Sequence, residues 1–273
     1  MPRLRPQHLA LPSGGTLHWQ EAPGAGDPLL LLHGLGGAAT VEFPMLPEAP
    51  GLSGRRTLLI DLPGFGLSRD APQRGIAGLV DGLEALVTHL RAKRFALMGH
   101  SMGGLVALLL AARHPERISA LCLAEGNLAP GHGQLSRGIA AIPLEDWCAG
   151  GRERVADRLP AGFADTFRQA DPAALWHAAR DLDRGTREDW RALFSGLKMP
   201  RSYLIGERSN AWNLDWLDLA GLQRAGIAIR TVTGAGHFMA QDAPAALAAQ
   251  IAAALDAPQV PVTVGMRGLS GSC

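Results

Sequence analysis

The chain has 273 residues, of which 47% are hydrophobic and 19% are charged. This composition excludes a disordered chain and a coiled coil, and the length suits one α/β domain with a core of its own. The 26 basic and 25 acidic residues give a formal net charge of +1, so the charge gives no indication of a nucleic-acid partner.

Three cysteines, at positions 122, 148 and 273, are too few and too scattered for a disulfide framework. No CxxC spacing indicates zinc, so we expect no metal. Residues 1–15 lack the apolar segment of a secretory leader, and the longest apolar run, 103–112, is too short to cross a bilayer. We therefore expect a cytoplasmic protein with no membrane span.

Strand patterns dominate the first half of the chain. Two short alternating stretches, near 8–11 and 16–21, are separated by a Pro-Ser-Gly-Gly turn and predict a β-hairpin. Continuous apolar runs of this length are typical of strands buried on both faces, as in a parallel sheet covered by helices. Six such runs follow the hairpin, at residues 29–32, 57–60, 95–98, 121–124, 202–205 and 227–232.

Apolar residues at helical spacing fill three of the segments between and after these runs, at 76–90, 102–112 and 243–255. Strands and helices in alternation predict an α/β fold with a doubly wound, mostly parallel sheet and right-handed crossovers. We assign residues 1–127 and 199–255 to this core.

The alternation stops between the fourth and fifth apolar runs. Residues 128–198 contain amphipathic segments with six Phe and Trp side chains, and they show no strand pattern. We interpret them as a helical cap inserted into the core. Residues 256–273 contain Pro and Gly but little apolar periodicity, so we expect a flexible C-terminal tail.

The motif Gly99–Gly103 (GHSMG) lies between a predicted buried strand and a predicted helix, which is the context of a nucleophile elbow. Glycines are needed there because the turn is too tight for neighbouring Cβ atoms. The turn would raise the Ser101 hydroxyl above the sheet, at a helix N-terminus that favours developing negative charge. Ser101 is therefore the candidate nucleophile, and the cap is expected to fold over the mouth of its pocket.

A second Gly-rich segment, His33–Gly37 (HGLGG), directly follows a buried strand. Its glycines let backbone N–H groups approach a substrate oxygen. The N–H groups of Leu35 and Met102 would together form an oxyanion hole. His33 itself is expected to bind nearby backbone atoms.

A third segment, Gly234–Phe238 (GAGHF), follows the last predicted strand. A neutral imidazole at His237 can accept the Ser101 proton and pass it to the leaving group. The late position of His237, at the carboxyl end of a strand, favours this role over that of a surface loop histidine.

In chain order, the motifs are HGLGG at 33–37, DLPGFGLS at 61–68 (Asp61–Ser68), GHSMG at 99–103 and GAGHF at 234–238. In content and order they resemble the α/β-hydrolase superfamily, over about residues 8–255. The resemblance implies Ser101 as nucleophile and His237 as base, and it makes Asp61–Ser68 a structural turn. A serine at the elbow departs from dehalogenase-like and epoxide-hydrolase-like members, which carry Asp there. No nucleotide-binding motif occurs, so no cofactor is expected.

The triad acid is not where the resemblance places it. Family members commonly carry Asp after the penultimate strand, in a pattern like Gly-x-x-Asp, but here that strand ends in GERS and places Ser209 at the Asp position. A hydroxyl cannot supply the charge that stabilises an imidazolium. Glu207, by resemblance, points away from the site.

We predict Glu125 as the acid, because the strand that it ends should lie between the nucleophile strand and the strand that ends at Gly206. The three strand ends would then share one edge of the sheet, and the longer Glu side chain would help it to reach His237. Asp215 is the alternative acid, and a site without an acid is the other possibility.

The expected function is a serine hydrolase that cleaves a small to medium, partly apolar carboxylic ester through an acyl-enzyme. A C–C bond hydrolase or a cofactor-free perhydrolase would use the same triad. A non-catalytic member, with the pocket used for binding or as an accessory subunit, is the third alternative, because position 209 lacks the Asp. The expected partner is a small-molecule substrate.

Overall fold

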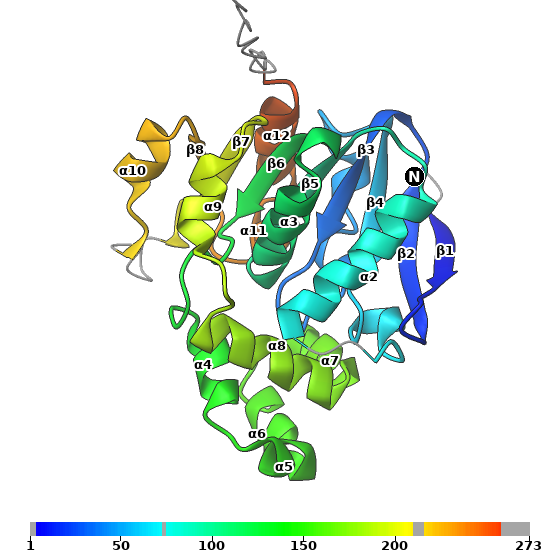
Figure 1. The fold of residues 1–273 in the computed structure, drawn as a ribbon, viewed down its shortest axis with the longest axis vertical. Helices are drawn as coiled ribbons and strands as arrows, with labels where there is room; N and C mark the ends of the chain where they lie inside the picture. Colours follow the sequence, from blue (N-terminus) through cyan, green and yellow to red (C-terminus); the bar gives the residue numbers. More distant parts are fainter. Residues whose placement is uncertain (1–3, 73–74, 210–215, 258–273) are drawn as a thin grey trace, which may run out of the picture.

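The computed structural model describes residues 4–72, 75–209 and 216–257, and its centre is an eight-stranded sheet (Figure 1). The strands lie in the order β1-β2-β4-β3-β5-β6-β7-β8. Their bounds are β1 (Arg5–Ala10), β2 (Thr16–Ala22), β3 (Ala25–Leu32), β4 (Arg55–Asp61), β5 (Phe95–His100), β6 (Ile118–Ala124), β7 (Arg201–Gly206) and β8 (Ala228–Val232). The first two strands form the predicted hairpin, and from β4 to β8 all neighbours are parallel. The predicted doubly wound, mostly parallel sheet is therefore confirmed.

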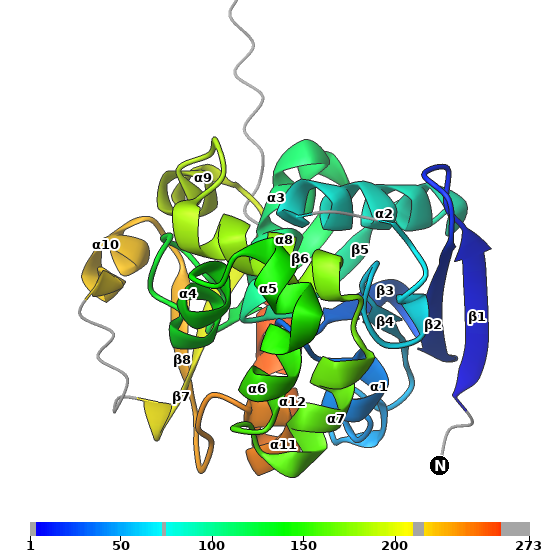
Figure 2. The same cartoon turned by 90° about the horizontal axis from the view of Figure 1, so that it is seen from below.

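Two separate hydrophobic cores, one on each face of the sheet, explain why the strand runs are continuous. Leu30 and Leu32 of β3 pack into one core with α2 and α3, whereas Leu29 and Leu31 pack into the other with α12. Figure 2 shows α2 and α3 on one face and α1, α11 and α12 on the other. These helices and the shorter elements of the core are α1 (Ala39–Glu42), η1 (Leu46–Glu48), η2 (Gly66–Ser68), α2 (Gly75–His89), α3 (Met102–Arg113), η3 (Pro115–Arg117), α10 (Leu219–Arg224), α11 (Met239–Asp242) and α12 (Pro244–Leu255).

Residues 128–198, all of them described, form helices and no strand. The elements are α4 (Gln134–Ala140), α5 (Leu144–Asp146), η4 (Trp147–Gly151), α6 (Arg152–Ala156), α7 (Ala161–Gln169), α8 (Pro172–Arg184) and α9 (Trp190–Gly196). Helices α4 to α8 gather at one end of the sheet (Figure 1). The N–H of Asp171 donates to the carbonyl of Gly64, which follows β4, so this end is the carboxyl edge of the strands. We call α4 to α8 the cap helices.

Helix α9 differs in position from the cap helices. It packs against α3 beside the sheet (Figure 2), so it extends the helical layer on that face. Trp190 and Phe194 of α9 are buried there. The predicted tail lies outside the described residues from position 258 onward. Each helix in the described ranges is too short or too polar to cross a membrane.

Candidate active site

Ser101 occupies a strained turn between β5 and α3. Its backbone lies at φ 52° and ψ −119°, a conformation that side chains rarely adopt. A Cβ atom on Gly99 would collide with the Gly103 carbonyl, and one on Gly103 would collide with the Leu32 carbonyl. The two glycines therefore make the tight turn possible, and the structure has the elbow geometry that the motif predicts.

His237 and Glu125 meet at the carboxyl edge of the sheet. His237 follows β8 and Glu125 follows β6, and His237 Nδ1 lies 2.6 Å from Glu125 Oε2. The Glu125 side chain is 8% exposed and that of His237 is 35% exposed. The other carboxylate oxygen, Oε1, accepts a hydrogen bond of 2.9 Å from the N–H of Gly206. With Nδ1 donating to Glu125, Nε2 is the nitrogen that remains free to accept a proton.

The surroundings of Glu125 favour its ionised form. Burial by itself would raise the pKa of this carboxyl group, but the hydrogen bond and charge of His237, with contributions from Ser209 and the Gly206 N–H, outweigh burial. The pKa of Glu125 is therefore held below its usual range. A carboxylate in this state can fix the tautomer of His237 and stabilise its imidazolium form.

The other candidate acids are placed differently. Ser209, at the position where the resemblance expects Asp, is fully buried and within reach of the Glu125 carboxylate. Glu207 is exposed and accepts a hydrogen bond of 2.8 Å from the N–H of Gly234, so it stabilises the turn after β8. Asp215, the alternative acid, lies outside the described residues.

Ser101 and His237 belong to adjoining loops. The ring centroid of His100, the residue before Ser101, lies 4.6 Å from that of His237, and the planes are inclined by 51°. The sheet order places β5, β6, β7 and β8 side by side, so the loops that follow them share one edge. The structure thus gathers Ser101, Glu125 and His237 at that edge.

The N–H groups predicted for an oxyanion hole belong to the loop after β3, residues 33–37, and to the first residue of α3, and we call the loop the oxyanion loop. Within the described part of the chain, neither the N–H of Leu35 nor that of Met102 donates a hydrogen bond to another protein atom. His33 is buried below the loop: its Nε2 accepts from the N–H of Leu62 at 3.0 Å, and its Nδ1 donates to the carbonyl of Gly34 at 2.8 Å. His33 therefore binds backbone atoms, as predicted.

Asp61 is structural, which confirms the prediction for the turn that begins there. Its Oδ1 accepts a hydrogen bond of 2.7 Å from the N–H of Ala39, and its Oδ2 accepts one of 2.9 Å from the N–H of Leu67. The first of these bonds holds the start of α1 against the end of β4. Asp61 thereby places α1, and with it Glu42, beside the oxyanion loop.

Glu42 is the polar residue of this region that sequence reasoning missed. Its Oε1 lies 2.5 Å from Nδ1 of His100, and its Oε2 accepts a hydrogen bond of 3.1 Å from the N–H of Gly34. A single glutamate in a helix of four residues has no periodicity and no motif spacing, so the sequence contained no signal for its role.

Side chains of the cap helices contact two of the loops around this site. Phe167 packs against Gly36 of the oxyanion loop, and Phe163 lies 5.4 Å from Phe238 between ring centroids. Figure 2 shows α7 beside α1. The cleft between them has a volume of only about 10 Å³, which is room for one water molecule. It is lined by Gly37, Ala38, Val41, Glu42, Gly162, Phe163, Thr166, Phe238 and Gln241.

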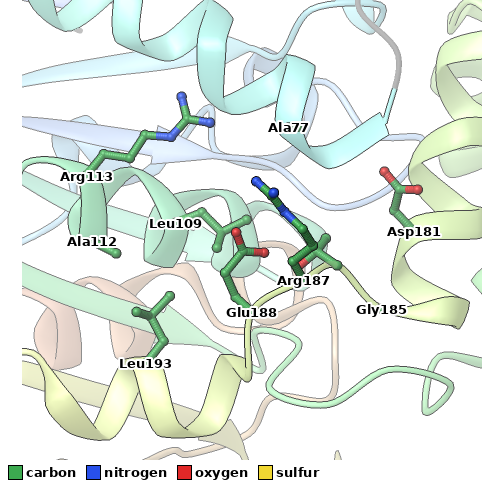
Figure 3. A pocket seen from close by; sticks show the side chains of 10 residues that line it. Ala77, Leu109, Ala112, Arg113, Asp181, Gly185, Arg187, Glu188 and Leu193 are labelled. Atoms are coloured by element: carbon green, nitrogen blue, oxygen red, sulfur yellow. The ribbon is translucent and has the colours of Figure 1, made fainter.

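A larger cavity, of about 420 Å³, lies away from these residues (Figure 3). Its α3 residues are at the C-terminal end of that helix, whereas Ser101 precedes the N-terminal end, roughly 15 Å away at 1.5 Å per residue. Its side chains include charges of both signs, Arg113, Arg187, Asp181 and Glu188. This cavity therefore contributes nothing to the site around Ser101. Among the described residues, no group of three or more His, Cys, Asp or Glu side chains is placed to hold a metal ion.

The fold and this arrangement of loops define the class of protein. The alpha/beta hydrolase fold model matches residues 27–181, more than half of the chain, and the chain belongs to this family.

Among known proteins, the chain is 37% identical over 157 residues to the dihydrolipoyllysine-residue acetyltransferase component of the acetoin cleaving system of Pseudomonas putida, covering 56% of this chain and 40% of that protein. It is 33% identical over 190 residues to the magnesium-chelatase 30 kDa subunit of Rhodobacter capsulatus, covering 63% and 66%. The chain thus spans less than two thirds of the length of both relatives. A thermophilic esterase from Thermogutta terrifontis has a similar fold, with a TM-score of 0.75 at 22% identity, covering 90% of this chain and 96% of that one.

Proposed function

We propose that the protein is a serine hydrolase that cleaves a carboxylic ester through an acyl-enzyme. The observation that carries the proposal is the 2.6 Å contact between His237 Nδ1 and Glu125 Oε2, beside an elbow that holds Ser101 at φ 52°. Nucleophile, acid and base follow along the chain in the order Ser101, Glu125, His237, which is the order of the family.

In the first half of the reaction, Oγ of Ser101 attacks the carbonyl carbon of the ester while Nε2 of His237 takes the hydroxyl proton. The carbonyl oxygen becomes an oxyanion, and the N–H groups of Leu35 and Met102 stabilise it. The tetrahedral intermediate collapses, the bond to the alcohol oxygen breaks, and the alcohol leaves with the proton from Nε2. Glu125 stabilises the transient imidazolium through Nδ1–H.

In the second half, water takes the place of the alcohol. Nε2 of His237 removes one proton from the water as its oxygen attacks the acyl carbon, and the same N–H groups hold the second oxyanion. Collapse of this intermediate returns the proton to Oγ of Ser101 and releases the carboxylic acid. The cycle consumes one water and one ester and needs no cofactor.

The surroundings of the site favour a small to medium, partly apolar substrate. Phe163 and Phe238 are half-buried where the cap meets the core, and Val41 of α1 lines the same cleft. This cleft lies beside Ser101 and His237 without being lined by them, and it is too small for an acyl group, so we expect a substrate to displace side chains of α7 on entry. Apolar groups interact favourably with such aromatic walls because their burial removes apolar surface from water.

The test is a chain-length series of p-nitrophenyl esters with wild type and Ser101→Ala, combined with labelling by a fluorophosphonate probe. We expect turnover and labelling of the wild type, and a loss of turnover of about 10⁴-fold or more in the variant. Turnover that persists in Ser101→Ala would overturn the serine mechanism. Labelling without turnover of any ester would support Ser101 as a nucleophile but exclude ester cleavage. A vinylogous diketone substrate would then test C–C bond hydrolysis. A wild type that is neither labelled nor active would indicate a binding protein.

A further inference from the structure

Glu42 and His100 form a buried ion pair that the reaction just described does not use. The residues are 7% and 4% exposed, and Oε1 of Glu42 lies 2.5 Å from Nδ1 of His100. Glu42 ends α1, behind the oxyanion loop, and His100 ends β5, directly before Ser101. The pair therefore joins the oxyanion loop region to the nucleophile elbow.

Glu42 also binds the oxyanion loop itself. Its Oε2 accepts a hydrogen bond of 3.1 Å from the N–H of Gly34, the residue before the candidate oxyanion donor Leu35. The space around the carboxylate is tight, because a Cβ atom on Gly37 would lie 3.0 Å from Oε2. One carboxylate thus holds both the backbone next to Leu35 and the side chain next to Ser101.

His100 extends the connection to the base. Its ring lies 4.6 Å from that of His237 between centroids. It also lies 6.1 Å from the ring of Phe238. Three loops, which carry the candidate oxyanion donor, nucleophile and base, therefore meet at the Glu42–His100 pair.

We propose that the Glu42–His100 pair is a positioning device for catalysis, which holds the Leu35 N–H and the His237 ring in register with Ser101. The inference rests on the proposed function and deepens it. Neither residue transfers a proton or touches the reacting atoms in this role. Both act through the loops that they connect.

A positioning role for the pair can be distinguished from a role in folding stability, because the two roles predict different effects of substitution. Desolvation of a buried ion pair offsets most of its Coulombic attraction, so an apolar pair of similar volume is often equally stable or more stable. Misplacement of a catalytic group by 1 Å, by contrast, costs about 10²-fold in rate. Replacement of the pair by apolar residues should therefore lower the rate far more than the stability, and the main cost in stability is the N–H of Gly34, which loses its acceptor.

The surroundings of both members of the pair favour their charged forms. Burial alone would raise the pKa of Glu42, but the charge and hydrogen bond of His100, with His33 and the Gly34 N–H, outweigh it and lower that pKa. Burial alone would lower the pKa of His100, but Glu42, Glu125 and the His237 backbone outweigh it and raise that pKa. The titratable groups that face the His100 ring are thus Glu42, Glu125 and His237.

The test compares three variants with wild type in steady-state ester hydrolysis, thermal unfolding and fluorophosphonate labelling. Glu42→Gln keeps the shape and an acceptor for Gly34 but removes the charge. Glu42→Leu/His100→Phe replaces the pair by apolar side chains and keeps a ring beside His237. His114→Gln is the matched control, because it breaks a Glu–His contact of 2.7 Å, between His114 and Glu84, on α2 and α3 outside the site.

We expect Glu42→Gln and the double variant to lose about 10-fold or more in kcat while KM changes by less than about threefold, in the range expected for misplaced catalytic groups. The double variant should melt only slightly lower than wild type, because the N–H of Gly34 loses its acceptor, and His114→Gln should keep wild-type kinetics. In addition, loss of the His100 proton at alkaline pH should break the pair and lower kcat. This decline should begin at lower pH in Glu42→Gln, since His100 loses the anion that raises its pKa.

A kcat equal to wild type in the double variant, or a change in KM alone, would overturn the proposal. A pH profile of kcat whose alkaline decline is unchanged in Glu42→Gln would also overturn it. Probe labelling separates this failure from a failure of the proposed function. If the wild type is labelled but no ester turns over, slower labelling of Glu42→Gln supports the pair and equal labelling refutes it. If the wild type is neither labelled nor active, both proposals fall.

Discussion

Glu125 reaches His237 across the end of a strand that separates them. Strands β6 and β8, which precede the two residues, are not neighbours, because β7 lies between them. The carboxylate spans this gap with Oε1 on the N–H of Gly206, at the end of β7, and Oε2 on Nδ1 of His237. A side chain at position 206 would obstruct this path, since a Cβ atom there would collide with the Gly236 carbonyl.

This contact predicts the effect of neutralising Glu125. Glu125→Gln keeps the shape but loses the charge that stabilises the imidazolium of His237, so kcat for a p-nitrophenyl ester should fall about 10³- to 10⁴-fold. Glu207→Gln is the control at the end of β7, and it should stay within about threefold of wild type. Near-normal turnover in Glu125→Gln, with a large loss in Asp215→Asn measured beside it, would assign the acid role to Asp215.

Ser209 offers a second position for the acid. It is fully buried and within reach of the Glu125 carboxylate, so an Asp side chain there would face the same region. We expect Glu125→Ala/Ser209→Asp to recover about 10-fold or more of the kcat that Glu125→Ala loses. Ser209→Asp alone should be destabilised at neutral pH, because it buries a second carboxylate beside Glu125. A double variant no more active than Glu125→Ala would show that position 209 cannot serve His237.

The strain at Ser101 predicts a trade between activity and stability. A side chain at φ 52° and ψ −119° costs about 1–3 kcal/mol, whereas glycine adopts such a conformation freely and loses about 0.5–1 kcal/mol of chain entropy. Ser101→Gly should therefore raise the free energy of unfolding by about 1 kcal/mol and abolish turnover. Urea denaturation of Ser101→Gly and Ser101→Ala checks this, since alanine keeps the strain and should bring no such gain.

The pKa of Glu125 predicts how stability depends on acid. Because the folded protein holds this pKa below the ordinary value of 4.5, the unfolded chain binds the proton more readily. The stabilisation is complete above the ordinary value and is lost as the pH falls through the lowered pKa. The difference in unfolding free energy between wild type and Glu125→Gln should be constant above about pH 5 and shrink below it. A difference that stays constant down to about pH 3 would contradict this expectation.

The tight cleft predicts that Phe163 limits substrate size. Phe163→Ala should remove the contact with Phe238 and widen the cleft of about 10 Å³ between α7 and α1. We expect kcat/KM to rise severalfold for octanoate and longer esters and to change less than about threefold for acetate. A uniform loss for every chain length would instead indicate that Phe163 only packs the cap onto the core.

Much of this architecture follows from local pattern. Continuous apolar runs mark strands buried on both faces, and helical spacing marks the segments that cover them. The elbow around Ser101 is recognisable because steric crowding demands glycines at fixed positions. Even the meeting of Glu125 with His237 follows from topology, since the carboxyl ends of the parallel strands β6, β7 and β8 share one edge of the sheet.

Other features depend on distances that no local pattern encodes. Glu42 ends α1, a helix too short to show periodicity, and the Asp61 contact with α1 helps to bring its carboxylate to Gly34 and His100. Helix α9 has the amphipathic pattern of the cap helices, yet it packs beside α3, because the apolar face of a helix is satisfied by any apolar surface of the right shape. Periodicity states which face of an element is buried, whereas the partner of that face is decided by how the whole chain packs.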